Sequence, residues 1–335
     1  MAVKSVKTDK KERIIEAQEK KEDFSFDNTL RPKTLEDYVG QSNIKKHLSV
    51  SIASAKIRMQ SLEHIVFYWA PGLGKTTLAN IVAGEMWVNL KISSWPAIEK
   101  QSDLVSVLSN LQDNDILFID EIHRLKPQIE EVLYTAMEDF TIDIMVWKWT
   151  WATSVRIPIP PFTLIWATTK FSSLSAPLRD RFGNVLKLDF YTNEEILSII
   201  KRNSVLLGVN LDEETYKKIA SRSRGTPRIA NRLLKIVRDY VTIWHDINNS
   251  KEFNQIFADL NIDSLWLDFL DKKILETIYT KFSWGPVWLN TLAASIWEDE
   301  DTIENVVEPY LLQIWFLERT PKWRKLTDLA IKHLF

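Results

Sequence analysis

The 335-residue chain contains no cysteine. This absence excludes a disulfide framework, thiolate-ligated zinc and thiol catalysis. The chain also lacks an apolar run of about 18 residues, so no membrane span is expected. The charged stretch 1–25 lacks the apolar segment of a signal peptide, and we therefore expect a cytoplasmic protein. Neither charge dominates, with 43 basic and 45 acidic residues. That balance excludes a uniformly basic nucleic-acid binder but allows a local basic patch.

Glycine is also scarce, whereas tryptophan is abundant. The chain has 8 glycines and 14 tryptophans. An average glycine content of about 7% would give roughly 23 glycines in this length. The two counts added together come close to that value, which makes the positions of the tryptophans informative.

The distribution of apolar residues predicts a multidomain α/β protein. Short apolar runs at 64–68, 116–119 and 162–167 alternate with helical segments, which predicts a mostly parallel sheet covered on both faces. Residues 141–157 alternate like a β-hairpin. Beyond Tyr191 the pattern is helical, and the last 70 residues predict helices near 272–282, 289–294 and 302–314 followed by a β-wing. We therefore expect a flexible tail, a large α/β domain, a small helical domain and a winged-helix domain, with bounds 1–25, 26–191, 192–262 and 263–335.

The strongest local signal is the segment APGLGKTT at 70–77, which follows a predicted strand and opens a predicted helix. In a phosphate loop, Gly72 and Gly74 let backbone N–H groups approach phosphates, and Lys75 contacts the β/γ-phosphates. The Thr76 hydroxyl is a ligand for Mg²⁺. The plain alternative is an ordinary glycine-containing turn between strand and helix.

Further polar residues follow the other predicted strands. Asp120 ends the run ILFID at 116–120 and Glu121 follows it, so that Asp120 could hold Mg²⁺ through water and Glu121 could activate the attacking water. Thr168 or Thr169 ends the run LIWATT, and we favour Thr169 as a sensor of the γ-phosphate. A solvated acidic strand end and an ordinary β-strand threonine are the alternatives.

Three arginines follow these strands. Arg179 and Arg181 stand in LRDRFG, where an arginine can act as a finger in a neighbouring subunit's site. Arg228 opens a predicted helix in RGTPRIANRL and could reach the phosphates from the helical domain. For Arg179 and Arg181 the alternative is a surface salt bridge. The five histidines show no metal-binding spacing.

The order of these motifs is that of the AAA+ ATPases. Their amino-acid sequences resemble those of the RuvB family, whose members drive branch migration of Holliday junctions in recombination and repair. The segments that carry the resemblance are LRPKTLEDYVGQ (30–41), PGLGKTTLA (71–79), LFIDEIHRL (117–125), AMEDF (136–140), APLRDRFG (176–183), RGTPRIANRLL (224–234) and EPYLLQIWFLERTP (308–321).

The resemblance implies an ATP- and Mg²⁺-dependent motor that works as a hexameric ring on duplex DNA. The partner RuvA would dock on hairpin 141–157, and the resolvase RuvC would join the complex. Arg181 matches the arginine finger. By motif position, the residues implied to bind nucleotide are Leu30, Arg31, Gly72, Gly74, Lys75, Thr76, Thr77, Glu138, Asp139, Phe140, Arg181, Tyr191 and Arg228.

The last residues of the chain form a basic patch. Arg319 and Arg324 match DNA-contacting positions of the family, and Lys322, Lys325 and Lys332 add charge suited to phosphate contacts. A solvated basic tail is the alternative. Glu300 stands where the family often has arginine, so that contact should be absent here.

The tryptophans depart from the family pattern. The family has glycine at the positions of Trp69, Trp87, Trp95, Trp147, Trp149, Trp166, Trp284, Trp288, Trp315 and Trp323. We hypothesise that one codon was misread and that the natural protein carries glycine there. We expect Trp69 to crowd the phosphate loop and Trp166 to lack room between its strand and the nucleotide. The alternative is aromatic enrichment, with WKWTW (147–151) as a sticky strand for a partner.

Two other functions fit part of the motif set. A clamp-loader-like AAA+ protein would use ATP as an assembly switch on DNA without translocating. A scaffold could bind nucleotide without hydrolysing it, although the presence of Lys75, Asp120, Glu121 and Arg181 disfavours that reading.

Overall fold

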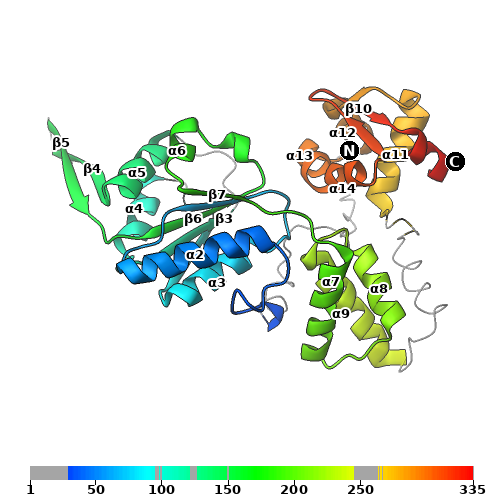
Figure 1. Cartoon of the computed structure of the whole chain (residues 1–335). Coiled ribbons are helices and arrows are strands. Elements are labelled where there is room, and N and C mark those ends of the chain that lie inside the picture. Colours follow the sequence, from blue (N-terminus) through cyan, green and yellow to red (C-terminus); the bar gives the residue numbers. More distant parts are fainter. Residues whose placement is uncertain are drawn as a thin grey trace, which may run out of the picture. The chain divides into compact units, whose positions relative to one another are not determined.

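The computed structural model describes residues 29–94, 98, 100–120, 127–148, 151–244, 263, 265 and 267–334. The chain divides into two compact units, one of which contains Ser25–Tyr191 and the other Thr192–Phe335 (Figure 1). The predicted tail 1–25, Glu121 and the tryptophans at 95 and 149 lie outside the described residues. Within the described part, no helix combines the length and apolar composition that a membrane span needs.

The first unit is built around a five-stranded parallel sheet in the order β2-β3-β6-β1-β7. The three predicted apolar runs form its centre, and all six residues of β6 are buried. This confirms the expected parallel sheet, because strands covered on both faces need continuous apolar sequence. The strands are β1 (Ile65–Tyr68), β2 (Leu90–Ser94), β3 (Ile116–Asp120), β6 (Thr163–Thr168) and β7 (Asn184–Lys187).

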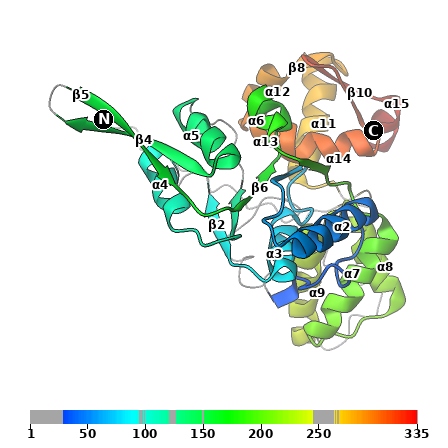
Figure 2. The ribbon, with the colours of Figure 1, turned by 60° about the vertical axis from the view of Figure 1, so that its left-hand side comes forward.

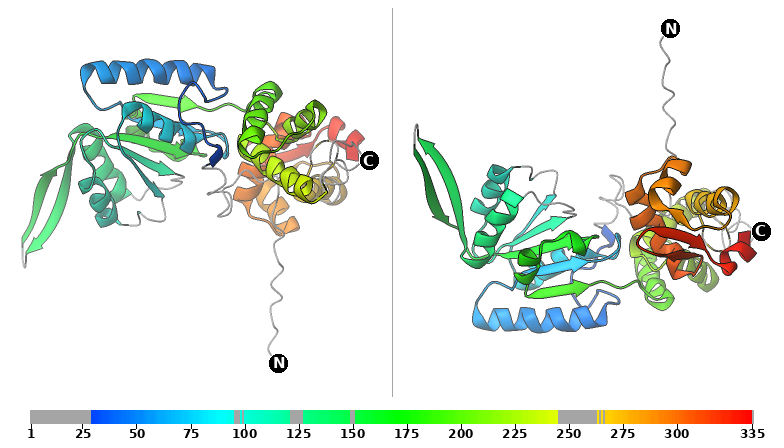
Figure 3. Two further views of the ribbon diagram at one scale, coloured as in Figure 1. Left: turned by 90° about the horizontal axis from the view of Figure 1, so that it is seen from below. Right: turned by 90° about the horizontal axis from the view of Figure 1, so that it is seen from above.

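Helices cover both faces of this sheet (Figure 3). α2 (Ser42–Arg58) and α3 (Lys75–Met86) lie on one face, whereas α4 (Gln101–Ser109) and α5 (Pro127–Glu138) lie on the other. The apolar sides of α4 and α5 pack against β3 and β6 in one buried cluster. A short 3₁₀ turn, η2 (Phe171–Ser173), and α6 (Ala176–Asp180) follow β6.

A two-stranded antiparallel hairpin extends beyond α5 (Figure 2). It consists of β4 (Thr141–Lys148) and β5 (Trp151–Pro158), which pair from Thr141 with Pro158 to Lys148 with Trp151. The hairpin confirms the alternation read at 141–157. Arg156 and Asp143 form an exposed cross-strand ion pair at 3.0 Å.

The second unit begins with three helices, α7 (Asn193–Leu206), α8 (Glu213–Arg222) and α9 (Pro227–Trp244). Thr192 and Glu195 form a capping box at the start of α7, and Asp212 caps α8. These side chains satisfy backbone donors that the first helical turn leaves unpaired. We call this part the lid (residues 192–244).

The C-terminal part, which we call the head (residues 265–334), combines helices with a three-stranded antiparallel sheet in the order β8-β10-β9. The helix predicted at 302–314 is divided into three parts: α13 (Glu300–Thr302), a π-helical turn η3 (Ile303–Val307) and α14 (Glu308–Gln313). The division falls next to Pro309, the second residue of α14, which donates no backbone hydrogen bond. The elements are α11 (Phe269–Phe282), β8 (Val287–Trp288), α12 (Leu289–Ile296), α13 (Glu300–Thr302), η3 (Ile303–Val307), α14 (Glu308–Gln313), β9 (Leu317–Arg319), β10 (Trp323–Leu326) and α15 (Asp328–Leu334).

Several tryptophans occupy backbone conformations that favour glycine. Trp87 and Trp297 end α3 and α12 in the left-handed region, with φ of 60° and 59°. Helices commonly end with glycine in this conformation, because a Cβ atom is unfavourable there. Trp69, Trp284 and Trp315 also have positive φ, at 122°, 74° and 57°. The positions are therefore those expected of glycine, and the misread-codon hypothesis stays a prediction.

Trp166 is accommodated differently from what the sequence predicts. Its indole is fully buried on the α4/α5 side of the sheet and meets Phe182 edge-on, with ring centroids 5.9 Å apart. The indole Nε1–H has no hydrogen-bond acceptor there. A buried donor without a partner costs about 1–3 kcal/mol, so this site tolerates tryptophan at a cost.

Candidate functional site

The loop between β1 and α3 has a backbone that requires glycine at two positions. Gly72 and Gly74 have φ of 79° and 99°. A Cβ atom on Gly74 would lie 2.7 Å from the Tyr38 hydroxyl oxygen. The backbone N–H of Trp69 donates to the carbonyl oxygen of Thr168, 3.2 Å away, and ties the loop to β6. The cradle predicted at 70–77 is therefore present.

Lys75 is the first residue of α3, and its side chain turns back to this loop. Its side chain is nearly buried, and Nζ donates to the carbonyl oxygens of Trp69 (2.7 Å) and Ala70 (3.2 Å). Gly74 is the N-cap of α3, so the first N–H groups of the helix are directed toward the same loop. An ammonium group beside a helix N-terminus favours an anion, and phosphate is the anion that such loops bind.

Two tyrosines support the loop through hydrogen bonds to one of its carbonyl groups. The hydroxyls of Tyr38 and Tyr191 lie 2.8 Å apart, and each lies 3.2 Å from the carbonyl oxygen of Leu73. Burial raises the pKa of Tyr38 well above its usual value, so its hydroxyl remains a donor at neutral pH. The sequence analysis did not identify Tyr38 as a site residue, because no local pattern indicates that it contacts Tyr191, about 150 positions later.

Other predicted residues lie at the carboxyl ends of β3 and β6, the same edge of the sheet at which β1 leads into the loop. Asp120 ends β3 opposite Ala167 of β6, and Thr168 pairs with Tyr68 of β1. The Thr168 hydroxyl is buried and accepts the N–H of Lys170 at 3.0 Å, which leaves Thr169, half-buried just beyond the strand, as the better-placed sensor.

Oxygen donors suited to Mg²⁺ are available at this edge. Thr76 is half-buried in the first turn of α3, and Asp120 is a half-buried carboxylate at the strand end. Hydroxyl and carboxylate oxygens are the hard ligands that Mg²⁺ takes beside phosphates, so these residues fit the ion. Among the described residues, no cluster of three or more acidic, histidine or cysteine side chains forms a separate metal site.

Arg181 is held by residues of its own chain. One guanidinium nitrogen lies 3.1 Å from a carboxylate oxygen of Glu138, and another donates to the carbonyl oxygen of Pro177 at 2.8 Å. The guanidinium carbon lies 4.5 Å from the centre of the Tyr134 ring. Arg181 is half-buried at the C-terminus of α6, whereas Arg179 contacts Phe171.

The remaining predicted nucleotide residues lie in several places. Leu30 is buried and Arg31 is half-buried at the start of the first unit. Asp139 is exposed at the end of α5, and the ring of Phe140 packs edge-on against Phe162. Thr77 follows Thr76 in α3. Arg228 lies half-buried in α9 of the second unit, at its N-terminus, as the proline before it predicts.

The two predicted DNA-contacting arginines share one buried carboxylate. Glu308 at the start of α14 is fully buried, and it accepts from Nε of Arg324 at 2.5 Å and lies 3.1 Å from a terminal nitrogen of Arg319. Arg319 also contacts Glu304 at 2.6 Å. Arg319 is about one-third exposed, but Arg324 is only 1% exposed. A phosphate contact by Arg324 stays a prediction, and it requires this buried pair to open.

Comparison with family models assigns the whole described chain to one family. The Holliday junction DNA helicase RuvB P-loop domain matches residues 30–188. The RuvB AAA lid domain matches residues 191–263, and the RuvB C-terminal winged helix domain matches residues 265–335.

Individual relatives agree with these matches. The Holliday junction branch migration complex subunit RuvB of Dehalococcoides mccartyi (strain CBDB1) is 52% identical over 325 residues, which cover 97% of this chain and 93% of that protein. The solved structure of the Thermotoga maritima RuvB Holliday junction branch migration motor is 48% identical with a TM-score of 0.84, and the match covers 91% of this chain and 98% of that one. A single-residue variant of the same protein matches with 47% identity and a TM-score of 0.83 over the same shares.

Proposed function

This chain belongs to the RuvB family of Holliday junction DNA helicases, and we propose that it is an ATP-hydrolysing motor that drives branch migration of Holliday junctions. The observation that carries the proposal is the pairing of a phosphate loop around Lys75 with a winged-helix head in one chain. The proposed domains are residues 26–191 for the large ATPase domain, 192–262 for the small helical domain that contains the lid, and 263–335 for the winged-helix domain that contains the head.

In the proposed ATP site, Lys75 exchanges the carbonyl oxygens of Trp69 and Ala70 for the β/γ-phosphates. The N–H groups at the start of α3 add donors, and the Tyr38–Tyr191 pair keeps the Leu73 carbonyl turned away from the phosphates. These contacts act on charge that changes during phosphoryl transfer, which is where electrostatic stabilisation is effective.

Other residues complete the proposed site. Thr76 and Asp120 would hold Mg²⁺, which supplies charge neutralisation at the phosphate oxygens when bound. Glu121 orients the attacking water, and Thr169 contacts the γ-phosphate or that water. Leu30 and Arg31 contact the adenine side. Arg228 reaches the phosphates from the lid, and Thr77, Asp139, Phe140 and Tyr191 line the site.

Arg181 is proposed as the finger of a hexameric ring. Its guanidinium is already oriented by Glu138 and the Pro177 carbonyl, so it needs to exchange one exposed carboxylate for a neighbour's γ-phosphate. Glu138 is more than half exposed, and an ion pair near the surface contributes only about 0–1 kcal/mol, so little free energy is lost in the exchange. Glu138 then borders the nucleotide of the adjacent subunit.

The head would contact duplex DNA through Arg319, with Arg324 held behind it, and the hairpin β4–β5 would dock RuvA in a complex that also contains RuvC. Phosphate contacts carry no sequence information, which suits a motor that moves along any DNA. A clamp-loader-like switch is disfavoured, because the winged-helix head with its basic wing serves DNA binding.

The test is ATP-driven dissociation of a four-way DNA junction, with and without RuvA. We expect dissociation by the parent protein, none by Lys75→Ala because nucleotide no longer binds, and none by Glu121→Gln, which should still bind ATP. If the parent protein hydrolyses ATP but dissociates no junction, either with or without RuvA, the result would favour the switch over the motor.

A further inference from the structure

Arg224 stands in the turn between α8 and α9 of the lid, four residues before Arg228. Its backbone has a φ of 52°, in the left-handed region that arginine rarely adopts. Its side chain is only 4% exposed. A strained backbone and a buried charge both cost free energy. Such features are kept only where the surrounding contacts hold them in place and compensate for that cost.

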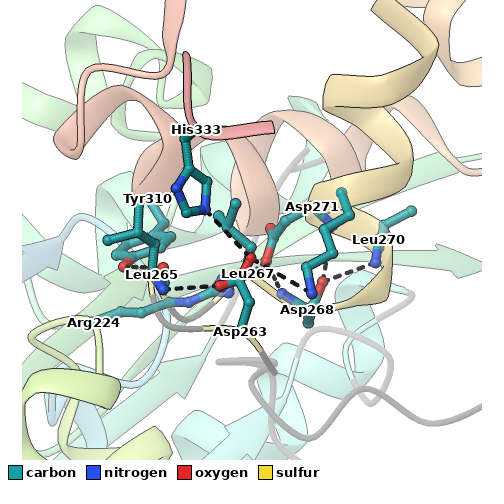
Figure 4. Close-up of polar contacts among 10 residues, drawn as sticks. Arg224, Asp263, Leu265, Leu267, Asp268, Leu270, Asp271, Tyr310 and His333 are labelled. Carbon is teal, nitrogen blue, oxygen red and sulfur yellow. Dashed lines mark hydrogen bonds and ion pairs between the residues drawn. The ribbon is translucent and has the colours of Figure 1, made fainter. Parts of the chain in front are cut away.

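Those contacts lie in the head (Figure 4). The guanidinium of Arg224 forms an ion pair with Asp271, whose carboxylate is fully buried in the first turn of α11. Its central carbon lies 4.2 Å from the centre of the Tyr310 ring in α14. One lid residue therefore contacts two different helices of the head.

The head side of this contact is rigidly held. The Asp271 carboxylate also accepts the backbone N–H of Asp268 at 2.8 Å, and Asp268 in turn accepts the N–H groups of Leu270 and Asp271 at 2.9 Å. The Tyr310 hydroxyl donates to the carbonyl oxygen of Leu265 at 3.1 Å. Both partners of Arg224 are therefore held in place by a hydrogen bond within the head, which restricts their independent rotation.

The segment that enters α11 is fixed as well. Asp263 accepts the N–H groups of Leu265 and Leu267, both at 2.9 Å, and lies 3.5 Å from Lys272. His333 of α15 approaches the same carboxylate at 3.7 Å. The end of the chain is thus tied to the contact region of Arg224.

A continuous series of contacts joins this region to the wing, by which we mean strands β9 and β10 and the turn between them (residues 317–326). Tyr310 lies two residues after Glu308 in α14, and Glu308 holds both Arg319 and Arg324. The path therefore runs from the α8–α9 turn through Arg224 and α14 to the arginines of β9 and β10. Energetic coupling between distant sites can travel through packed and hydrogen-bonded elements of this kind.

We propose that Arg224 is a positioning residue that couples the α8–α9 turn, which leads into Arg228 at the start of α9, to the DNA-contacting wing, so that nucleotide-dependent movement of the turn moves the head. The proposal rests on the proposed motor function for its consequence on DNA. The coupling itself is a property of the chain and can be measured without DNA.

The first experiment follows hydrogen exchange of peptides from α11 in the full-length protein, with and without a non-hydrolysable ATP analogue. In the parent, we expect the analogue to change the exchange rate of these peptides at least threefold. In Arg224→Gln the change should disappear, although analogue binding stays within twofold of the parent. An equal analogue response in the parent and in Arg224→Gln would overturn the proposal.

The second experiment measures junction dissociation per ATP hydrolysed. We expect Arg224→Gln to keep basal ATP hydrolysis within twofold and DNA binding within threefold, while dissociation per ATP falls tenfold or more. Asp271→Asn is the second variant, because the amide oxygen can still accept the Asp268 N–H and preserve the start of α11. Unchanged dissociation per ATP in both variants would overturn the proposal.

The matched control is Glu213→Gln, which removes an exposed ion pair between Glu213 and Lys201 within the lid. This control should match the parent in every measurement. A purely structural role for Arg224 would instead lower hydrolysis, DNA binding and dissociation together, and would leave their ratio constant. A parent that shows the exchange response but dissociates no junction would contradict the motor function while supporting the coupling.

Discussion

Replacing Glu308 by glutamine removes one charge from the buried cluster that orients the wing. The carboxylate is fully buried, it accepts two hydrogen bonds from Arg324, at 2.5 and 3.2 Å, and it lies 3.1 Å from Arg319. Arg324 cannot regain water without opening the wing, since it is only 1% exposed. Its positive charge would therefore remain buried beside a neutral amide.

The expected cost follows from this geometry. Removal of one partner of a buried ion pair destabilises by about 3–5 kcal/mol. The glutamine oxygen still accepts one hydrogen bond, which is worth about 1 kcal/mol, so a loss of about 3 kcal/mol is expected. At 1.36 kcal/mol for each tenfold change, this corresponds to roughly 150-fold easier opening of the wing.

Hydrogen exchange of peptides from β9 and β10 measures that opening directly. Glu304→Gln is the matched control, because Glu304 pairs with Arg319 at the surface, where an ion pair is worth about 0–1 kcal/mol. The double replacement Glu308→Leu with Arg324→Met should recover most of the loss, since apolar pairs can replace buried ion pairs. Equal exchange rates in Glu308→Gln and Glu304→Gln would refute this reasoning.

Four other outcomes are expected. Subunits with Arg181→Ala, mixed into parent rings, should suppress ATP turnover out of proportion to their number, because the finger acts on a neighbour; a proportional loss contradicts this. Arg319→Ala should weaken binding to all DNA sequences alike and lower the log–log salt slope by about one unit, whereas a sequence-selective loss would indicate base readout. Mass spectrometry of the protein from its source organism should find glycine in place of Trp69 and Trp166, and tryptophan in both peptides would end the misread-codon hypothesis. Burial lowers the pKa of His64, whose Nδ1 accepts the backbone N–H of Leu164 at 2.9 Å, so the folded state binds fewer protons than the unfolded state and its stability should fall as the pH drops below about 6.5. Thermal unfolding of His64→Gln should show a weaker dependence of stability on pH, and an unchanged dependence would contradict this assignment.

The phosphate loop could be predicted because its information is local. Gly72, Gly74 and Lys75 lie within four successive residues after an apolar run, and glycine permits the left-handed φ that both glycines adopt. The same holds for the parallel sheet and the hairpin, whose apolar patterns lie within single segments. The capping residue Thr192 and its partner Glu195 are equally local.

Residues that act through distant neighbours could not be predicted in this way. Tyr38 and Tyr191 meet at Leu73 only because the sheet and its connections bring them together. The sequence predicts a phosphate contact for Arg324, and only the fold shows that this side chain is buried against Glu308, so that the predicted contact requires the pair to open. Charge is visible in a sequence, but solvent exposure is decided by packing, and exposure determines whether an arginine meets DNA or a carboxylate.

By itself, the sequence determined the order of the domains, the phosphate loop with Lys75, and the excess of tryptophan over glycine, since each depends on residue type and spacing along one segment. Only the tertiary structure decided that Trp87 and Trp297 end helices in a left-handed conformation, and that Arg224 joins the lid to the head through Asp271. Long-range ion pairs, and a left-handed φ at a residue type that disfavours it, arise when the whole chain packs, because only then do residues far apart in sequence compete for the same space.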